Sequence, residues 1–341
     1  MVKASIIMPV FNAVHYIDNA IESIINQSYK NFELIIVDDG ATDGTGEKCR
    51  DYARRYPHII YIRQKNAGTC AARNKGMSIA KGEYIAFADH DDEYLEDYLQ
   101  ELIDLAEKDS LDMVKCGVLY EETYTHGHHC SKKEAFQKTT LTRDELVERY
   151  NALPISYFGV WNTIYRAETL KKYNIRFPEN IRHGQEDYFF NTEIIPYIHK
   201  VGFSDRVLYR HYRRLSQSTS AKYFEDRIDA MILYCQKEYQ VLKPLISRNN
   251  WPLEYAVLYS RKLTGIMSYC LSTDAKLPEE TCGKALNKFR SACPYEERVS
   301  LALLVKVFQR SVKYGLILIL AMFRQYPMMI CLWKKRRKIH D

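Results

Sequence analysis

Three carboxylates crowd around one histidine directly after an apolar run in the stretch YIAFADHDDEY, residues 84–94. Asp89, Asp91 and Asp92 lie within four positions, and like charges this close repel one another unless water or a cation separates them. Carboxylate oxygens are the ligands that Mg²⁺ and Mn²⁺ prefer, and on an extended segment Asp89 and Asp91 point the same way. The stretch therefore suggests a divalent-cation site, with a solvated acidic turn as the structural alternative.

Two acidic pairs and one arginine could take part in related chemistry. Asp38 and Asp39 precede a glycine at the end of another apolar run, where a carboxylate can bind a ribose hydroxyl or simply form a turn. Arg73 lies on an expected helix after a glycine-containing loop, either as a nucleotide contact or as a solvated side chain. Glu186 and Asp187 precede an aromatic run, where an acidic pair is often a helix N-terminal charge effect. The sequence contains no G-K-[ST] phosphate loop.

The elements that must position these groups alternate between strand and helix patterns over the first 120 residues. Apolar runs that predict strands end at the polar clusters, and apolar residues with helical spacing lie between them. The expected strands are 5–10, 32–40, 58–64 and 83–88, and the expected helices are 13–28, 69–80 and 95–105. Such alternation indicates a mainly parallel sheet with helices on both faces. Because ligands bind beyond the carboxyl ends of the strands in these sheets, the polar clusters should converge on one edge.

The composition is that of a globular protein whose positive charge is concentrated at one end. The chain has 341 residues, of which 46% are hydrophobic and 27% charged, enough to bury a core. The net charge is +6, but residues 301–341 contain nine Lys or Arg and one acid, so this tail carries +8 and the rest carries −2. The nearly neutral body argues against a nucleic-acid partner. Nine scattered cysteines without a C-x-x-C favour a reduced, cytoplasmic compartment, and the first apolar run is too short for a signal peptide.

The tail suggests a helix that lies on a membrane. Lys306, Gln309, Arg310 and Lys313 recur at positions i, i+3, i+4 and i+7, which would give one polar stripe on an otherwise apolar helix. Neither apolar run of the tail reaches the ~20 residues that a span requires. An interfacial helix fits better, with KKRRK (334–338) attracted to anionic headgroups. A core or oligomer helix with a solvated basic end is the alternative.

The remaining motif is HGHHC, His126–Cys130. It invites a zinc interpretation, but its spacing fits neither C-x-x-C nor H-x₃₋₅-H patterns. A polar loop is the favoured interpretation.

Five stretches together resemble family 2 glycosyltransferases, which have the GT-A fold. They are SIIMPVFN (5–12), SIINQSYKNFELIIVDDGATDGT (23–45), NAGTCAARNKGMSIAKGEYIAFADHDD (66–92), VWNTIYRAETL (160–170) and GQEDYFF (184–190). The resemblance is continuous over roughly residues 3–118 and continues in pieces to about 220. Members of this family transfer a sugar from a nucleotide-diphosphate donor with inversion at the anomeric carbon.

The resemblance implies a role for each matching residue. Asp91, together with Asp89, would bind a divalent cation, Mn²⁺ or Mg²⁺. Asp187, beside Glu186, would remove the proton of the acceptor hydroxyl, and Trp161 would lie on the acceptor side. The residues expected around the nucleotide and its diphosphate are Pro9, Asn12, Asp39, Arg73, Asp89, Arg210 and His211.

The implied function is an inverting, metal-dependent hexosyl transfer from a UDP-hexose to a glycan or polyprenyl-linked acceptor in surface polysaccharide assembly. We expect a catalytic GT-A domain over residues 1–220, a helical region over 221–300 and a membrane-associating tail over 301–341, with the protein peripheral on the inner face of the cell membrane. The resemblance leaves homo-oligomer formation open. One alternative is a nucleotidyltransferase, which typically has a Gly- and Arg-rich phosphate loop near the first strand. The other is a non-catalytic sugar-binding or assembly module, in which Asp91 and Asp187 would be dispensable.

Overall fold

The computed structural model describes residues 2–123, 129–214, 224–271, 277–293, 295 and 299–337. Most of the expected polar loop, His126 to His128, lies outside these residues. The chain divides into two compact units. The sheet unit comprises residues 1–146, 153–182 and 186–218, and the helical unit comprises residues 147–152, 183–185 and 219–341. The functional division at residues 220 and 300 stays a prediction.

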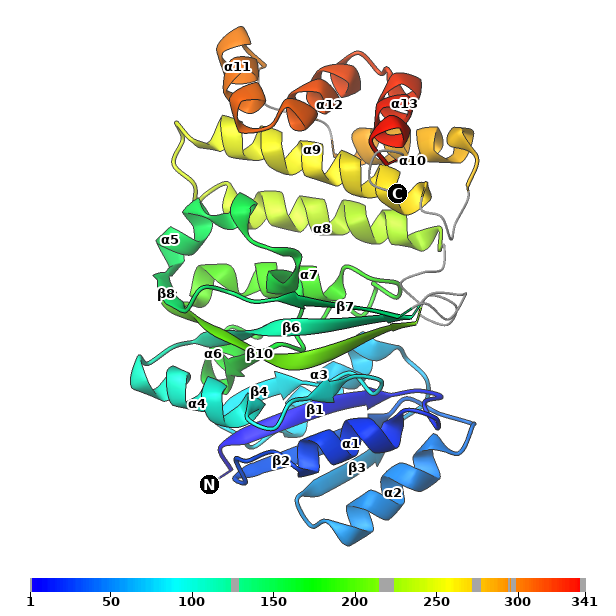
Figure 1. Ribbon diagram of the computed structural model, residues 1–341, viewed down its shortest axis with the longest axis vertical. Helices are drawn as coiled ribbons and strands as arrows, with labels where there is room; N and C mark the ends of the chain where they lie inside the picture. Colours follow the sequence, from blue (N-terminus) through cyan, green and yellow to red (C-terminus); the bar gives the residue numbers. More distant parts are fainter. Residues whose placement is uncertain are drawn as a thin grey trace. The chain divides into compact units, whose positions relative to one another are not determined.

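The first half of the sheet unit is a parallel sheet in which β1, β2 and β3 are each followed directly by a helix (Figure 1). The strands lie in the order β3-β2-β1-β4, and each is parallel to its neighbours. These elements are β1 (Ala4–Val10), α1 (Ile17–Ile25), β2 (Phe32–Asp38), α2 (Thr45–Arg55), β3 (Ile59–Arg63), α3 (Thr69–Ile79), β4 (Tyr84–Phe87) and α4 (Tyr98–Lys108). Because β1 and β2 are buried along their whole length, their sequences are apolar on both faces.

Alternate residues of the central strands face two different helical layers. Ile6 on β1 belongs to the large core that contains Ile21 of α1, whereas Ile35 on β2 packs with Ala72 of α3. The approach of α3 to β1 is close, because a Cβ added to Gly76 would lie 2.4 Å from a methyl carbon of Ile7. The expected sheet with helices on both faces is confirmed.

The second half of the sheet unit is mixed. It continues the order as β4-β9-β6-β10-β5, with β9 antiparallel to both neighbours and β10 parallel to β6. Here β5 (Glu93–Tyr94) pairs with β10 in antiparallel fashion, and β7 and β8 pair at the side with β6 and β10. The remaining elements are β6 (Met113–Thr123), β7 (His129–Glu134), β8 (Thr139–Thr142), α5 (Arg143–Glu148), β9 (Thr163–Arg166), α6 (Ala167–Lys172), α7 (Glu186–Glu193) and β10 (Lys200–Arg214). This half brings α7 and the end of β10 into the same unit as the parallel strands.

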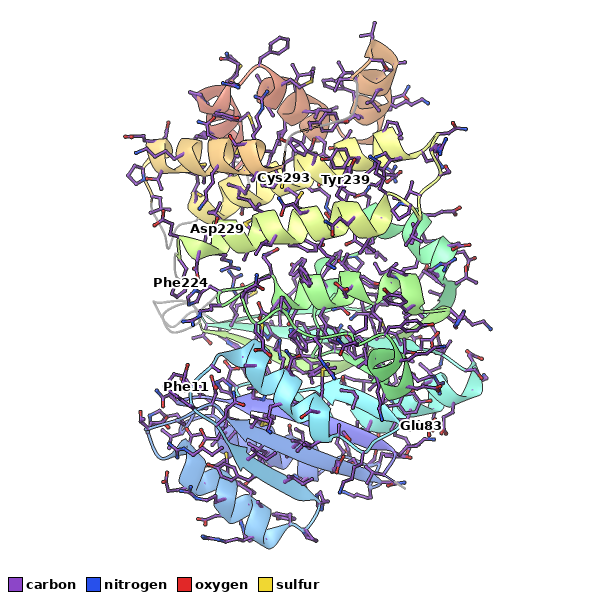
Figure 2. All side chains as sticks on the ribbon, turned by 180° about the vertical axis from the view of Figure 1, so that it is seen from behind. Phe11, Glu83, Phe224, Asp229, Tyr239 and Cys293 are labelled. Carbon is purple, nitrogen blue, oxygen red and sulfur yellow. The ribbon has the colours of Figure 1, made fainter. Side chains whose placement is uncertain are left out.

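The helical unit packs around α9, with α11, α12 and α13 as an outer layer over α9 and α10 (Figure 1). Its helices are α8 (Asp226–Leu242), α9 (Trp251–Cys270), α10 (Glu279–Ala292), α11 (Leu301–Arg310), α12 (Val312–Met322) and α13 (Tyr326–Arg337). Figure 2 shows Tyr239 on α8 and Cys293 after the end of α10. The ring of Tyr239 packs edge-on against that of Trp251 on α9, with 5.3 Å between the ring centroids. The Cys293 thiol donates a hydrogen bond to the carbonyl of Ile232 on α8 at 3.8 Å. Within the part of the chain that the structure describes, no helix is both long and apolar enough to cross a bilayer.

The tail is not one continuous amphipathic helix. The backbone of Ser311 is extended, with φ −165° and ψ 114°, and its hydroxyl accepts the N–H of Tyr314 as the N-cap of α12. Serine favours an N-cap because its oxygen satisfies an N–H group at the start of a helix. Lys306 and Arg310 therefore lie on α11 and Lys313 on α12, and the expected single polar stripe is wrong.

Candidate active site

A buried guanidinium gathers three carboxylates that are distant in the sequence. Arg73, on α3, is only 2% exposed. Its Nη1 lies 2.6 Å from Asp187 Oδ1, and its Nη2 lies 2.9 Å from Asp89 Oδ1. Glu186 Oε1 is 3.9 Å from the same Nη1. Residues expected to contact the nucleotide, bind the metal and supply the base therefore meet at one side chain.

The elements explain why this cluster forms. Asp89 follows β4 at its carboxyl end, and Arg73 extends from α3, which packs on β1 and β2. Glu186 and Asp187 occupy the first turn of α7, where the helix dipole favours negative charge. The backbone N–H of Val160 donates to the second oxygen of Asp187 at 3.4 Å. The carboxylate of Asp187 is thus held between a guanidinium and a backbone donor.

The charges of the cluster are not balanced, since one guanidinium faces three carboxylates. Burial raises the pKa of Asp187, the Arg73 guanidinium lowers it, and the carboxylates of Glu186 and Asp89 raise it again, to about 7. Among the described residues, Glu186 Oε2 and Arg73 Nε are buried without a hydrogen-bond partner. Buried polar atoms are normally paired, so these two atoms are available to form hydrogen bonds with a ligand. A carboxyl group that titrates near neutral pH is suited to general base catalysis.

A second cluster is built around Asp92, which was not among the predicted site residues. Asp92 is buried and accepts hydrogen bonds from the Tyr209 hydroxyl, His211 Nδ1 and the Tyr212 backbone N–H at 2.7–2.8 Å. Burial lowers the pKa of His211, but the Asp92 carboxylate raises it more, to about 9. The imidazole is therefore cationic at neutral pH. Trp161 stacks on it with an interplanar angle of 3° and a centroid distance of 5.3 Å. In the sequence, Asp92 could have been recognised as a site residue by its position as the third acid of the DHDD motif.

The structure separates Arg210 from His211. Consecutive residues of a strand point to opposite faces, and Arg210 Nη1 pairs with Glu93 Oε2 across β5 and β10 at 2.7 Å. His211 and Trp161 share the Asp92 cluster, whereas Arg210 contacts Glu93.

Asp39 organises the loop after β3. One of its oxygens accepts the Ala67 N–H and Gln64 Nε2, and the other accepts the Gly68 N–H, all at 2.8 Å. Gly68 has φ +93°, a conformation that side chains rarely adopt, and it directly precedes α3. Asp39 thus fixes the start of the helix that carries Arg73.

The end of β1 carries three residues of interest. The Asn12 side-chain oxygen accepts the Thr42 N–H at 2.9 Å, which ties this strand end to the loop after β2. The Pro9 carbonyl accepts from His90 Nδ1 at 3.2 Å. Between them, Phe11 is 44% exposed, and Figure 2 labels it at this strand end. Phe11 was not among the predicted site residues, although its position as an aromatic residue directly after an apolar strand was visible in the sequence.

The residues expected to bind a metal ion differ in their surroundings. Asp89 is paired with Arg73. Asp91 lines a cavity together with Tyr16, Asn19, Asp92, Glu93 and Tyr212. Within the described ranges, no group of three or more His, Cys, Asp or Glu side chains could hold a metal ion. Asp91 and Asp89 supply carboxylate oxygens, the donor type that Mg²⁺ and Mn²⁺ bind, but these two residues do not by themselves form a metal site.

The fold and these clusters define a GT-A enzyme, and comparison with known sequences shows its family. The family model described as "Glycosyl transferase family 2" matches residues 5–174. The glycosyltransferase EpsJ of Bacillus subtilis is 34% identical over 238 residues, which cover 69% of this chain and 67% of EpsJ. The minor teichoic acid biosynthesis protein GgaB of the same organism is 34% identical over 222 residues, 64% of this chain and 23% of GgaB. The chain belongs to glycosyl transferase family 2, and it is a glycosyltransferase.

A solved structure shows the same fold over nearly the whole chain. S. aureus TarS 1–349, crystallised with UDP-GlcNAc, superimposes with a TM-score of 0.74 at 21% identity and covers 98% of this chain and 92% of TarS 1–349. This likeness confirms the expected GT-A fold with an additional helical region. The matched part of the chain spans about two thirds of EpsJ and less than a quarter of GgaB.

Proposed function

We propose that the protein transfers a sugar, with inversion, from a nucleotide-diphosphate donor to a hydroxyl group of a glycan or polyprenyl-linked acceptor. The observation that carries this proposal is the cluster of Asp89, Glu186 and Asp187 around the buried Arg73. Asp187, with a pKa of about 7, accepts the proton of the attacking hydroxyl, while Glu186 keeps that pKa raised. Inversion requires one base and no enzyme nucleophile.

The leaving diphosphate needs positive charge nearby. Asp91, assisted by Asp89, would bind Mn²⁺ or Mg²⁺, and oxygens of the diphosphate would supply further ligands. When bound, this ion neutralises the charge that develops on the leaving group. His211, kept cationic by Asp92, adds a second positive group, whereas Arg210 is paired with Glu93 on the opposite face of β10 and is not assigned to the diphosphate.

We assign the nucleotide to the carboxyl ends of β1 and β2. Asn12 and Asp39 fix the loops there, and Pro9 fixes the DHDD turn through His90. The exposed ring of Phe11 offers a surface on which a base can stack. TarS was crystallised with UDP and UDP-GlcNAc, which supports a UDP-hexose as the donor to test first. The name of GgaB supports assembly of a cell-surface polymer as the setting.

The test is a donor hydrolysis and transfer screen with UDP-, GDP-, CDP- and TDP-sugars, in the presence of Mn²⁺, Mg²⁺ or EDTA. We expect turnover of a UDP-sugar that EDTA removes and Mn²⁺ or Mg²⁺ restores. Asp91→Asn should remove most of this turnover and leave the fold intact. Asp104→Asn, the same change on an exposed carboxylate of α4, is the matched control. Wild-type rates for Asp91→Asn in EDTA would rule out the metal assignment.

We also propose that the outer layer of the helical unit binds the anionic inner face of the membrane. Apart from Phe11 and Tyr173, all exposed large hydrophobic side chains in the described part of the chain lie on this layer: Leu301, Val305, Val312, Leu316, Met322, Phe323 and Met328. The same segment contains most of the chain's excess positive charge. Exposed apolar side chains combined with basic residues are typical of helices that lie in a lipid interface.

A further inference from the structure

The least expected buried group of the sheet unit is the ammonium of Lys115 on β6. Lys115 is 0% exposed. Its Nζ donates to the Gly159 carbonyl at 2.8 Å and to the Thr163 hydroxyl, and it lies 5.3 Å from the centre of the Tyr157 ring. Burial lowers the pKa of Lys115 to about 7. The proposed reaction assigns no role to Lys115.

Lys115 bridges the two ends of the segment 159–163. Two residues of this segment belong to the candidate site. The turn Gly159–Thr163 supplies the Val160 N–H that donates to Asp187. It also supplies Trp161, whose ring is parallel to that of His211. Lys115 binds the first and the last residue of this turn, so its side chain helps to hold the two ends together, beside the hydrogen bond from Thr163 to Gly159.

Gly159 contributes to the same arrangement. A Cβ added to Gly159 would lie 2.8 Å from two ring carbons of Trp161. The indole therefore occupies the space that a side chain at residue 159 would need. The carbonyl of this glycine accepts the hydrogen bond from Lys115, and its missing side chain admits Trp161.

We propose that Lys115 is a positioning residue that fixes the turn Gly159–Thr163 and thereby places the base Asp187 and the acceptor-side ring of Trp161. This inference rests on the proposed function of Asp187 and Trp161. It assigns to the buried ammonium an effect that is larger on turnover than on donor binding, because the turn supplies the N–H that donates to Asp187, whereas it reaches the donor side only through the stack of Trp161 on His211.

The energetics favour a functional role over a purely structural one. An ammonium removed from water costs free energy that hydrogen bonds repay only in part. A methionine of similar length would fill the same space without that cost. The Thr163 hydroxyl lies 3.2 Å from the Gly159 carbonyl and still donates to it in this variant, so the Gly159 carbonyl keeps a hydrogen-bond donor. Buried polar groups that cost stability are typical of sites where stability is traded for activity.

The first test measures kinetics and stability of Lys115→Met together. We expect the melting temperature to stay near the wild-type value and kcat for transfer to fall by about 10-fold or more, as small displacements of reacting groups do, while the donor KM changes by much less than kcat. Tyr157→Phe is the matched control, since it keeps the ring beside the ammonium and removes only a hydroxyl that has no hydrogen-bond partner among the described residues. It should behave as wild type.

The second test observes Trp161 without relying on catalysis. The chain has three tryptophans, and replacing Trp251 and Trp333 by Phe leaves Trp161 as the only indole. We expect Lys115→Met in this background to increase quenching of Trp161 by acrylamide. If the wild-type enzyme proves to have no transferase activity, this measurement still decides whether Lys115 positions the turn.

Two further variants keep the inference testable if Lys115→Met does not fold. Thr163→Val removes one acceptor of the ammonium at nearly constant shape, and Gly159→Ala displaces the Trp161 ring. Both should lower kcat by more than they raise the donor KM, and both should increase quenching. A folded Lys115→Met with wild-type kcat and wild-type quenching would overturn the proposal, as would folded Thr163→Val and Gly159→Ala variants with both values unchanged.

Discussion

At the scale of single residues, the pKa of Asp187 should govern the pH dependence of turnover. A base is active when deprotonated, so kcat/KM should rise with pH as Asp187 loses its proton near pH 7 and then level off. Asp187→Asn should lower kcat by ~100-fold or more and remove this limb of the profile. Asp51→Asn, an exposed carboxylate of α2, serves as the control. Survival of the same limb in Asp187→Asn would assign the titration to another group.

The pair of Asp92 and His211 makes a second pH-dependent prediction. In Asp92→Asn the pKa of His211 should fall from about 9 towards the ordinary histidine value of ~6.5. The imidazole would then be neutral at pH 8 and still largely charged at pH 6. Donor affinity, measured by calorimetry, should therefore fall more at pH 8 than at pH 6. An equal loss at both values would show that Asp92 supports the fold and not the charge of His211.

At the scale of elements, the close approach of α3 to β1 should make Gly76 intolerant of substitution. A Cβ at this position would collide with the buried Ile7, and overpacking of this kind costs ~1–3 kcal/mol of stability. The matched control is Gly283→Ala on α10, where the added carbon meets no atom within 4 Å. That change should instead stabilise by ~1 kcal/mol, because alanine favours a helix. Chemical denaturation measures both, and a stable Gly76→Ala would contradict this packing.

The sequence predicted the parallel half of the sheet better than the mixed half. Strands β1 and β2 are buried on both faces, so their apolar runs are continuous and their ends are marked by turn residues. Helix α2 was missed because its apolar face consists only of Cys49, Tyr52 and Ala53. The pairings of β9 and β10 depend on long-range contacts that no local pattern contains.

The same limit applies to the candidate site. The sequence indicated Arg73, Asp89 and Asp187 separately, and the resemblance suggested their roles. Only tertiary structure shows that one guanidinium binds both carboxylates. Asp92 and Lys115 were missed because their importance lies in what they contact, and a buried lysine looks like any other lysine in a strand.

At the scale of the whole molecule, the outer helical layer should determine membrane association. Replacing Leu316 and Phe323 by Ser should weaken flotation with anionic vesicles, because exposed apolar area is lost at constant charge. Tyr173→Ser, at an exposed aromatic residue of the sheet unit, is the control. Donor hydrolysis should continue in both variants. Full-length protein that does not float with anionic vesicles at low salt, but forms a dimer that the same substitutions dissociate, would assign this layer to self-association.

The guanidinium shared by Asp89 and Asp187 also implies that donor binding is linked to proton exchange. Suppose that the donor and its cation draw Asp89 away from Arg73. The Arg73 guanidinium then pairs more fully with Asp187, and the negative charge of Asp89 no longer repels the Asp187 carboxylate. Both changes lower the pKa of Asp187, so the enzyme should release a fraction of a proton when it binds the donor near pH 7, as thermodynamic linkage requires. The observed binding enthalpy should then vary with the ionisation enthalpy of the buffer, and this variation should vanish in Asp187→Asn. The donor would in this way prepare the base before the acceptor arrives, which favours an ordered mechanism with the donor bound first.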